Sequence, residues 1–423
     1  MKANLQEKFK NRKIKKPNPL LAKIIASAFR NISKKRNVSF EYADDFLKLQ
    51  DKQVIYLCQH RSSDDYIYVF AGLKHLNVHA LCGMQNVFQK YLYTLLKHLG
   101  VIAKYLYQPD MLSIKQMLQA KKLGDSLMIF PEGIQSTSGS THPINPATLK
   151  FIRKTGLPVV LVKVKGSYFT KTRYSKDIKK GKITVNYSKL FDAEDFKNLS
   201  EEELYTKMFE NFKYNEFEEH KNDNIEFVGE KPNIYGLDNI IYKCPCCEKE
   251  NNFVVENDTM TCKNCGLKVK MDNYYNLLPV NKDLPFSNTD EWYKWQRKVV
   301  KEEILDDNFS LSAKVKLNTI NPTKITKNYS LLNVGEGVIT LTNKGLRYVG
   351  TRYDEEVDLF FDAKALYSLS ISLSYDFDFY YKNEYFNFKL LENEKLMAKW
   401  MLATEEIHSL YDPAWADANK WVY

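Results

Sequence analysis

Between residues 37 and about 195, short apolar strands alternate with helices along the chain. The predicted strands cover 54–58, 126–130 and 159–164, and the predicted helices cover 66–76, 87–99, 113–122 and 148–154. Strands joined by helices in this way form α/β folds, in which a mostly parallel sheet is flanked by helices. In open sheets of this kind, active sites gather at the carboxyl ends of the strands.

Two polar motifs each follow one of these strands directly. His60 comes after the first strand and is followed five positions later by Asp65, while Glu132 leaves the second strand within a Phe-Pro-Glu-Gly turn. A neutral imidazole can take the proton of a reacting hydroxyl, and a carboxylate that holds the ring in the right tautomer improves it as a base. Asp64 is an alternative orienter, because residues four apart share one face of a helix. We expect His60 and Glu132 to share one edge of the sheet.

These motifs, in this order, resemble those of the glycerolipid acyltransferase family, the relatives of 1-acylglycerol-3-phosphate acyltransferase. The family's first motif, His-x4-Asp, matches His60 and Asp65. Its third motif, Phe-Pro-Glu-Gly-Thr-Arg-Ser, corresponds to residues 130–136, and its fourth, a Pro-led apolar strand, corresponds to 157–162. The resemblance covers roughly residues 40 to 190. It implies that His60 is the base, that Asp65 orients it, and that the donor is an acyl thioester on coenzyme A or acyl carrier protein.

The resemblance also implies that Glu132 and Gly133 help to seat the acceptor. However, the arginine of the third motif is Gln135 here, and glutamine cannot supply a positive charge to a phosphate. Lys104 is the only cation within the poorly matched second motif. We therefore expect acyl transfer to the hydroxyl of a lysophospholipid or a related lipid, with 1-acylglycerol-3-phosphate as one option and a glycolipid or another lipid alcohol as others. Cations that could replace the arginine are Lys104, Lys150, Arg153 and Lys165.

Two alternatives remain open at this level. Cys58 lies close to His60 and could act as a nucleophile, but its place in an apolar strand favours an inert, buried thiol. The chain could also be a non-catalytic lipid-binding or scaffold protein that retains the fold, which Gln135 favours and the intact His60, Asp65 and Glu132 disfavour. The other histidines have no such neighbours in the sequence and are expected to be structural or surface residues: His75, His79, His98, His142, His220 and His408.

Residues 1–36 combine a basic arm with an amphipathic helix, and they hold much of the excess that gives the chain a net charge of +10. Apolar side chains from Leu21 to Ile32 recur on one helical face. One interpretation is an anchor that lies in an anionic membrane surface, and the other is a first helix packed on the core. The sequence has no apolar run long enough for a transmembrane helix and no convincing signal peptide. We expect a cytoplasmic protein, peripheral on the inner face of the membrane.

Residues 240–272 contain two Cys-x2-Cys pairs, which are typical of a zinc ribbon. The four cysteines are Cys244, Cys247, Cys262 and Cys265. Their thiolates can bind Zn²⁺ tetrahedrally with no position left for water, so the predicted metal is structural. Cys246 is an alternative ligand, although the two-residue spacing favours Cys247. Such clustering indicates metal binding in a reducing compartment rather than disulfides. We do not expect a nucleic-acid partner, because no basic motif interleaved with aromatic residues accompanies the ribbon.

Residues 310–412 are predicted to form a β-rich domain that ends in a helix at 394–410 with Trp400 on it. The pattern weakly resembles a pleckstrin-homology-like or GRAM-like module. The many aromatic residues between 367 and 386 are expected to form a core and a cross-strand ladder. The predicted order of units is therefore the arm and helix at 1–36, an acyltransferase domain at 37–215, the ribbon at 240–272 and the β-rich domain at 310–412.

Overall fold

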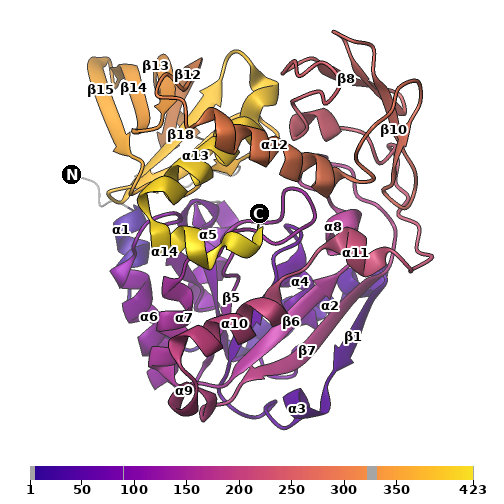
Figure 1. Cartoon of the computed structure of the whole chain (residues 1–423). Helices are drawn as coiled ribbons and strands as arrows, with labels where there is room; N and C mark the ends of the chain where they lie inside the picture. The colour runs from indigo at the N-terminus through magenta and orange to yellow at the C-terminus, as the bar shows by residue number, and fades with distance from the viewer. Residues whose placement is uncertain (1–4, 89, 322–330, 423) are drawn as a thin grey trace.

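The computed structural model describes residues 5–88, 90–321 and 331–422 (Figure 1). An α/β domain occupies the lower part of Figure 1, and the cysteine-bearing hairpins and the β-rich region lie above it. Helices α12 (Thr289–Glu303) and α13 (Met397–Tyr411) run between these upper parts.

The α/β domain is built on a seven-stranded sheet with the order β1-β7-β6-β2-β5-β3-β4. Its strands are β1 Val38–Tyr42, β2 Ile55–Cys58, β3 Val78–Gly83, β4 Ile102–Lys104, β5 Ser126–Ile129, β6 Val159–Lys165 and β7 Ile183–Phe191. Strands β2 to β6 all run parallel, while β1 and β7 run the other way. The predicted fold class, α/β with a mostly parallel sheet, is therefore confirmed.

Helices cover both faces of this sheet. They are α1 Leu5–Lys10, α2 Pro19–Lys35, α3 Asp44–Leu47, α4 Asp65–Ala71, α5 Lys90–His98, α6 Met111–Lys122, α7 Ala147–Thr155, α8 Ser167–Thr170, α9 Asp195–Asn198, α10 Glu201–Phe212 and α11 Glu216–His220, with a 3-10 turn η1 at Met84–Val87. Leu57 faces α6, α7 and α10, whereas its neighbours Tyr56 and Cys58 face α3 and α4. Burial on both faces explains why the strand sequences are continuous apolar runs rather than alternating ones.

The N-terminal helix α2 packs on α4. Ala22 and Ala26 are buried, the ring of Phe29 makes an edge contact with Tyr66 at 5.8 Å, and Arg30 donates to the carbonyl of Ala71. Part of the basic arm is also packed, because Lys10 is buried against Asp110. The packed-helix interpretation therefore describes one face of α2, while Leu20 and Ile24 on another face stay 70% and 56% exposed. Over the described residues, no helix combines the length and the apolar character needed to cross a bilayer.

The cysteine-bearing unit is a small antiparallel sheet of order β11-β10-β9-β8. Its strands are β8 Phe253–Glu256, β9 Thr259–Cys262, β10 Lys268–Met271 and β11 Leu277–Pro279, preceded by the 3-10 turn η2 at Leu237–Asn239. Helix α12 follows, and its Gln296 accepts the backbone N–H groups of Tyr242 and Lys243, at 2.8 and 3.0 Å. These bonds fix the chain just before the first cysteine pair.

The C-terminal region is a seven-stranded antiparallel sheet of order β15-β14-β13-β12-β18-β17-β16, which confirms the predicted β-rich region. Its strands are β12 Ser310–Ile320, β13 Leu331–Thr342, β14 Gly345–Arg352, β15 Glu355–Asp362, β16 Ser370–Ile371, β17 Asp376–Tyr381 and β18 Glu384–Leu390. The turn η3 at Glu394–Leu396 leads into α13, and α14 Pro413–Ala418 and η4 Lys420–Val422 end the described chain. The helix expected at 394–410 is thus η3 followed by α13, while the pleckstrin-homology-like name stays a prediction.

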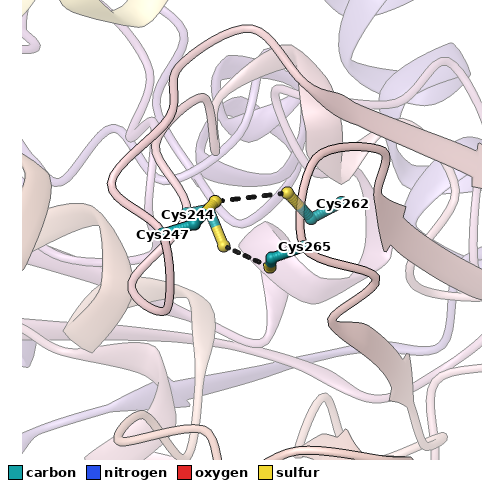
Figure 2. Close-up of side chains that lie close together, drawn as sticks. All are labelled: Cys244, Cys247, Cys262 and Cys265. Carbon is teal, nitrogen blue, oxygen red and sulfur yellow. Dashed lines mark hydrogen bonds between the residues drawn. The ribbon is translucent and has the colours of Figure 1, made fainter.

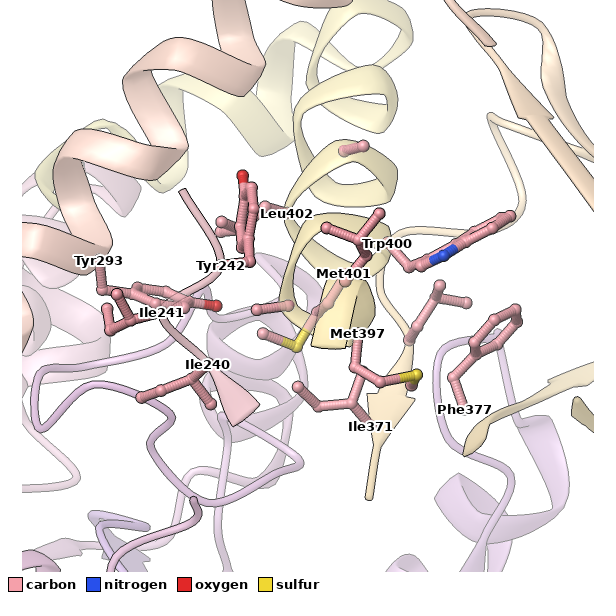
Figure 3. Close-up of a cluster of buried hydrophobic side chains, with 14 of the residues drawn as sticks. Ile240, Ile241, Tyr242, Tyr293, Ile371, Phe377, Met397, Trp400, Met401 and Leu402 are labelled. Atoms are coloured by element: carbon pink, nitrogen blue, oxygen red, sulfur yellow. The ribbon is translucent and has the colours of Figure 1, made fainter. Parts of the chain in front are cut away.

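One hydrophobic core joins the cysteine unit, α12 and the β-rich region. Ile240 and Tyr242 pack in it with Tyr293 of α12 and with Trp400 and Met401 of α13 (Figure 3). The same core includes side chains of the α/β domain, among them Ile134, Tyr168, Phe169 and Tyr174. The C-terminal half of the chain is therefore packed directly onto loops at the carboxyl ends of the parallel strands.

Candidate active site and metal centre

His60 and Asp65 lie together at the carboxyl end of β2. The ring nitrogen Nδ1 of His60 is 3.3 Å from Oδ2 of Asp65, and the same oxygen accepts the backbone N–H of Ser62 at 2.7 Å. Asp65 opens α4 and is fully buried, whereas the His60 side chain is 20% exposed. With the proton on Nδ1 donated to Asp65, the lone pair on Nε2 is left for the hydroxyl of a substrate.

Asp64 does not compete for this role. Its Oδ1 accepts Nζ of Lys171 at 2.7 Å, and Lys171 lies in the segment that follows α8. Cys58 is fully buried within β2, and burial raises the pKa of its thiol well above its ordinary value. A thiol in that state is a poor nucleophile. The structure thus brings together the predicted pair, His60 with Asp65. Asp64 pairs with a lysine instead, and Cys58 is buried in the strand.

Glu132 lies beside His60, because β2 and β5 are adjacent strands. Its Oε2 accepts the backbone N–H of His60 at 2.7 Å, and its Oε1 accepts the N–H of His142 at 2.9 Å and the hydroxyl of Tyr214 at 3.0 Å. The family resemblance implied that Glu132 helps to seat the acceptor. In the structure both of its oxygens accept hydrogen bonds from protein groups. These bonds hold the backbone of His60 and the backbone of His142.

Burial governs the charge of the carboxyl groups at the site. It raises the pKa of Glu132 to about 8, although the N–H groups of His142 and His60 and the hydroxyl of Tyr214 oppose that shift. Burial also raises the pKa of Asp65, and the hydrogen bond from His60 is the strongest opposing effect. The aromatic ring of Phe130 packs at 4.8 Å from the His60 ring and covers one side of it. These carboxyl groups are therefore held in an environment with little water.

Arg61 locks the loop that follows His60 to α11. Its guanidinium pairs with Glu216 at 3.1 Å and with Glu219 at 2.6 Å, and it stacks on the ring of Tyr214 at 4.2 Å. The carboxylate of Glu216 also accepts the backbone N–H of Gly166 at the end of β6, at 3.0 Å. The ends of β2 and β6 are thus tied through one buried ion-pair network.

The remaining predicted acceptor residues have different places. Gly133 adopts a φ of +75° in the turn after β5, a conformation that favours glycine, and open space surrounds the position of a Cβ there. The carbonyl of Gln135 accepts a hydrogen bond from the buried Arg173 at 2.9 Å. Lys104 lies on β4, which β5 and β3 separate from β2, and its Nζ donates to the carbonyl of Tyr105 at 3.3 Å. The structure does not bring Lys104 beside His60.

Several residues of the site carry no signal in the sequence. Lys171 places a cation next to Asp64, and Arg173 bridges Gln135 and the carbonyl of Ile371 in the β-rich region, at 2.7 Å. Tyr214 lies far along the chain from the His60 motif, in no recognisable pattern. His142 was expected to be an isolated structural residue. Its side chain does accept the N–H of Thr137, at 3.2 Å, but its backbone belongs to the site through Glu132.

The four predicted ligand cysteines converge on one point (Figure 2). The Sγ atoms of Cys244, Cys247, Cys262 and Cys265 all lie within 4.8 Å of one another. Cys244 and Cys265 are 3.7 Å apart, and Cys247 and Cys262 are 3.8 Å apart. Four sulfurs bound tetrahedrally to Zn²⁺ at ~2.3 Å would be about 3.8 Å apart, so the group fits that ion. Cys246 points away, with its Sγ 3.8 Å from the carbonyl of Asp283.

Comparisons with known proteins address the first half of the chain. Residues 32–165 match the family model described as Acyltransferase, and this segment includes His60, Asp65 and Glu132. A comparison with curated proteins found no match. Among solved structures, the chain is similar to the crystal structure of the 1-acyl-sn-glycerophosphate (LPA) acyltransferase, PlsC, from Thermotoga maritima, with 19% identity over 45% of this chain and 75% of that one and a TM-score of 0.37. That similarity is too distant to assign a substrate.

Proposed function

We propose that the acyltransferase domain at residues 32–165 moves a fatty acyl group from an acyl thioester to the hydroxyl of a lysolipid. The observation that carries this proposal is the pairing of His60 with buried Asp65 at the carboxyl end of β2, directly beside the turn that contains Glu132. A partly exposed imidazole held by a carboxylate is the arrangement that general-base catalysis requires.

In the proposed reaction, the acceptor oxygen attacks the carbonyl carbon of the thioester while Nε2 of His60 takes the hydroxyl proton. The new C–O bond forms, the C–S bond breaks, and the sulfur leaves as a thiolate that receives the proton back from the imidazolium. Asp65 stabilises the imidazolium between these two steps. No side chain forms a bond to the acyl group, which agrees with the burial of Cys58.

The acceptor is proposed to be a lysophospholipid or a related lipid, with 1-acylglycerol-3-phosphate as one option. Gln135 cannot supply the charge of the family's arginine, and Arg173 beside it is already engaged with two carbonyls. Lys171 is 30% exposed and pairs with Asp64 next to the His60 motif, and it is proposed as the cation that an anionic head group meets. The donor is proposed to be acyl coenzyme A or acyl carrier protein.

Membrane contact is proposed to occur through α2. Its exposed Leu20 and Ile24 lie near exposed lysines, including Lys23, on a helix that packs against α4. Burial of apolar side chains and attraction to anionic head groups act together in such helices. A lipid acceptor would then be met at the surface in which it resides.

The four-cysteine group is proposed to hold a structural Zn²⁺. All four positions of a tetrahedral ion would be filled by thiolates, which leaves none for a substrate or water. The ion would fasten the two hairpins that precede α12, so its contribution would be to folding rather than to the transfer step.

The proposed function is tested with purified protein, labelled acyl coenzyme A or acyl carrier protein, and a panel of lysolipids that differ in head group. We expect an acylated product that His60→Ala removes and Asp65→Asn lowers by about 100-fold or more, because the imidazole loses its orienting carboxylate. Cys58→Ala should retain most of the activity. Wild-type protein that acylates no lysolipid with either donor would favour the non-catalytic alternative.

A further inference from the structure

The loop at residues 136–142 fixes the backbone of His60 from two sides. At one end, the N–H of Ser136 donates to the carbonyl of His60 at 2.8 Å. At the other end, the N–H of His142 donates to Glu132, which in turn accepts the N–H of His60. Both backbone polar groups of His60 are therefore held by this loop or by the carboxyl group that the loop contacts.

The loop is held by hydrogen bonds rather than by apolar packing of its own side chains. Its sequence is Ser-Thr-Ser-Gly-Ser-Thr-His, so it brings no apolar side chain to a core. Gly139 adopts a φ of +102°, and a Cβ there would come within 2.8 Å of the ring of Phe217. A local hydrogen bond from Ser136 Oγ to the carbonyl of Ser140, at 2.6 Å, closes the loop, and the carbonyl of Gly139 accepts the backbone N–H of Glu216 at 2.9 Å.

The serine side chains at the centre of the loop are also anchored by α12, which belongs to the C-terminal half of the chain. Oδ1 of Asp290 accepts the hydroxyls of both Ser138 and Ser140, each at 2.6 Å. Its Oδ2 accepts Nδ2 of Asn215 at 2.8 Å and Nζ of Lys294 at 2.7 Å. Asp290 is 1% exposed, so these bonds form away from water, where an ionised acceptor binds hydroxyl donors strongly.

Asp290 thus reaches across more than one unit of the fold. It lies about 150 residues beyond the loop and far outside the segment 32–165, yet it joins α12 to the loop and to Asn215, the residue that caps α11. A second contact of this type lies near the C-terminus, where the side chain of Asn419 pairs with the backbone N–H and carbonyl of Ile144, at 2.7 and 3.2 Å.

We propose that Asp290 is a positioning residue for acyl transfer: it holds the 136–142 loop, and the loop holds His60 at the place from which its imidazole accepts a proton. The inference rests on the proposed function. It makes α12, and with it the packed C-terminal half, a part of the active-site scaffold rather than a separate binding module.

The kinetic test compares Asp290→Ala with the double variant Ser138→Ala/Ser140→Ala, which removes the same hydrogen bonds from the other side. Each should lower kcat by about 10- to 100-fold with little change in KM, because a base displaced by ~1 Å loses rate rather than binding. The variant with all three substitutions should be no slower than Asp290→Ala alone. Asp290→Asn, which keeps an oxygen for the serines, should recover much of the rate. Glu302→Ala, on the exposed end of the same helix, is the control.

Unchanged kcat in Asp290→Ala, or losses that multiply in the combined variant, would overturn the proposal. The serine variant leaves α12 intact. It therefore tests whether the hydrogen bonds of Asp290 support kcat even if Asp290→Ala does not fold. Hydrogen exchange of peptides that span 133–145 provides a readout independent of activity. Faster exchange in Asp290→Ala and in the serine variant, but not in Glu302→Ala, supports the holding role. Unchanged exchange contradicts it even if the wild-type protein acylates nothing, an outcome that would refute the proposed function alone.

Discussion

At the scale of single residues, the site depends on where each polar group finds its partner. Asp65 meets the His60 ring, Asp64 meets Lys171, and Glu132 meets backbone N–H groups rather than open space. Three neighbouring carboxyl groups therefore have three different roles. Spacing along the sequence left Asp64 and Asp65 as candidates to orient the ring, and the structure places Asp65 at Nδ1 of His60 while Asp64 pairs with Lys171.

The buried carboxyl of Glu132 should make stability depend on pH. Its pKa is raised to about 8 in the folded protein from 4.5 in the unfolded chain, so between these values the folded state holds the extra proton. The stability that this proton contributes is complete below pH 4.5 and is lost as the pH rises through about 8. The side chain introduced by Glu132→Gln cannot titrate. The difference between the Tm of the wild type and the Tm of this variant should therefore decrease between about pH 5 and pH 8.5. A Tm difference that increases over that range would refute the raised pKa of Glu132.

Lys171 should select acceptors by charge. Removal of a charge-assisted hydrogen bond costs about 1.5–3 kcal/mol, so Lys171→Ala should raise KM for a phosphate-bearing lysolipid about tenfold or more while leaving KM for a neutral one unchanged. Lys176→Ala, an exposed lysine of the same segment, is the control. Steady-state assays with both acceptor types decide the matter, and equal KM changes for the two acceptors would exclude this role.

At the scale of elements, α2 has one packed face and one exposed face. The face with Ala22 and Ala26 packs on the domain, and Leu20 and Ile24 remain exposed. The double variant Leu20→Asp/Ile24→Asp should therefore lower the affinity for anionic vesicles, measured by co-sedimentation, by about tenfold, because two apolar side chains no longer enter the lipid. Its Tm should not change. Leu305→Asp changes an equally exposed side chain elsewhere and should not affect binding. Vesicle binding that survives in the α2 variant would place the membrane contact on another surface.

Sequence patterns predicted the elements but not the contacts between distant ones. Apolar runs such as 159–164 identify strands because both faces of a parallel sheet are buried, and the His60 motif and the cysteine pairs are local spacings. Tyr214, Arg173 and Asp290 contact the site or the loop beside it from other parts of the chain, and no local pattern marks them. Their positions follow from how the C-terminal half packs on the first, which depends on a three-dimensional core rather than on periodicity.

At the scale of the whole molecule, the cysteine unit connects the two halves. It leads directly into α12 and shares one core with the β-rich region and with loops of the α/β domain. Metal analysis of freshly purified protein should give about one zinc per chain, and Cys244→Ser/Cys265→Ser should remove it and lower Tm, because metal binding contributes to folding. Cys246→Ser should change neither value, since Cys246 lies outside the cluster. Protein that contains no zinc and keeps its Tm in the double variant would refute the structural metal.

In the proposed reaction, the imidazole of His60 takes a proton from a lipid hydroxyl as a thioester is cleaved. The most direct measurement is the rate of acyl transfer from a labelled acyl thioester to the best lysolipid of the panel. It is made with the wild-type protein and with His60→Ala, after their Tm values are shown to be equal. We expect product with the wild type and at least a 100-fold lower rate with the variant. Equal rates in the two proteins would contradict the proposed reaction.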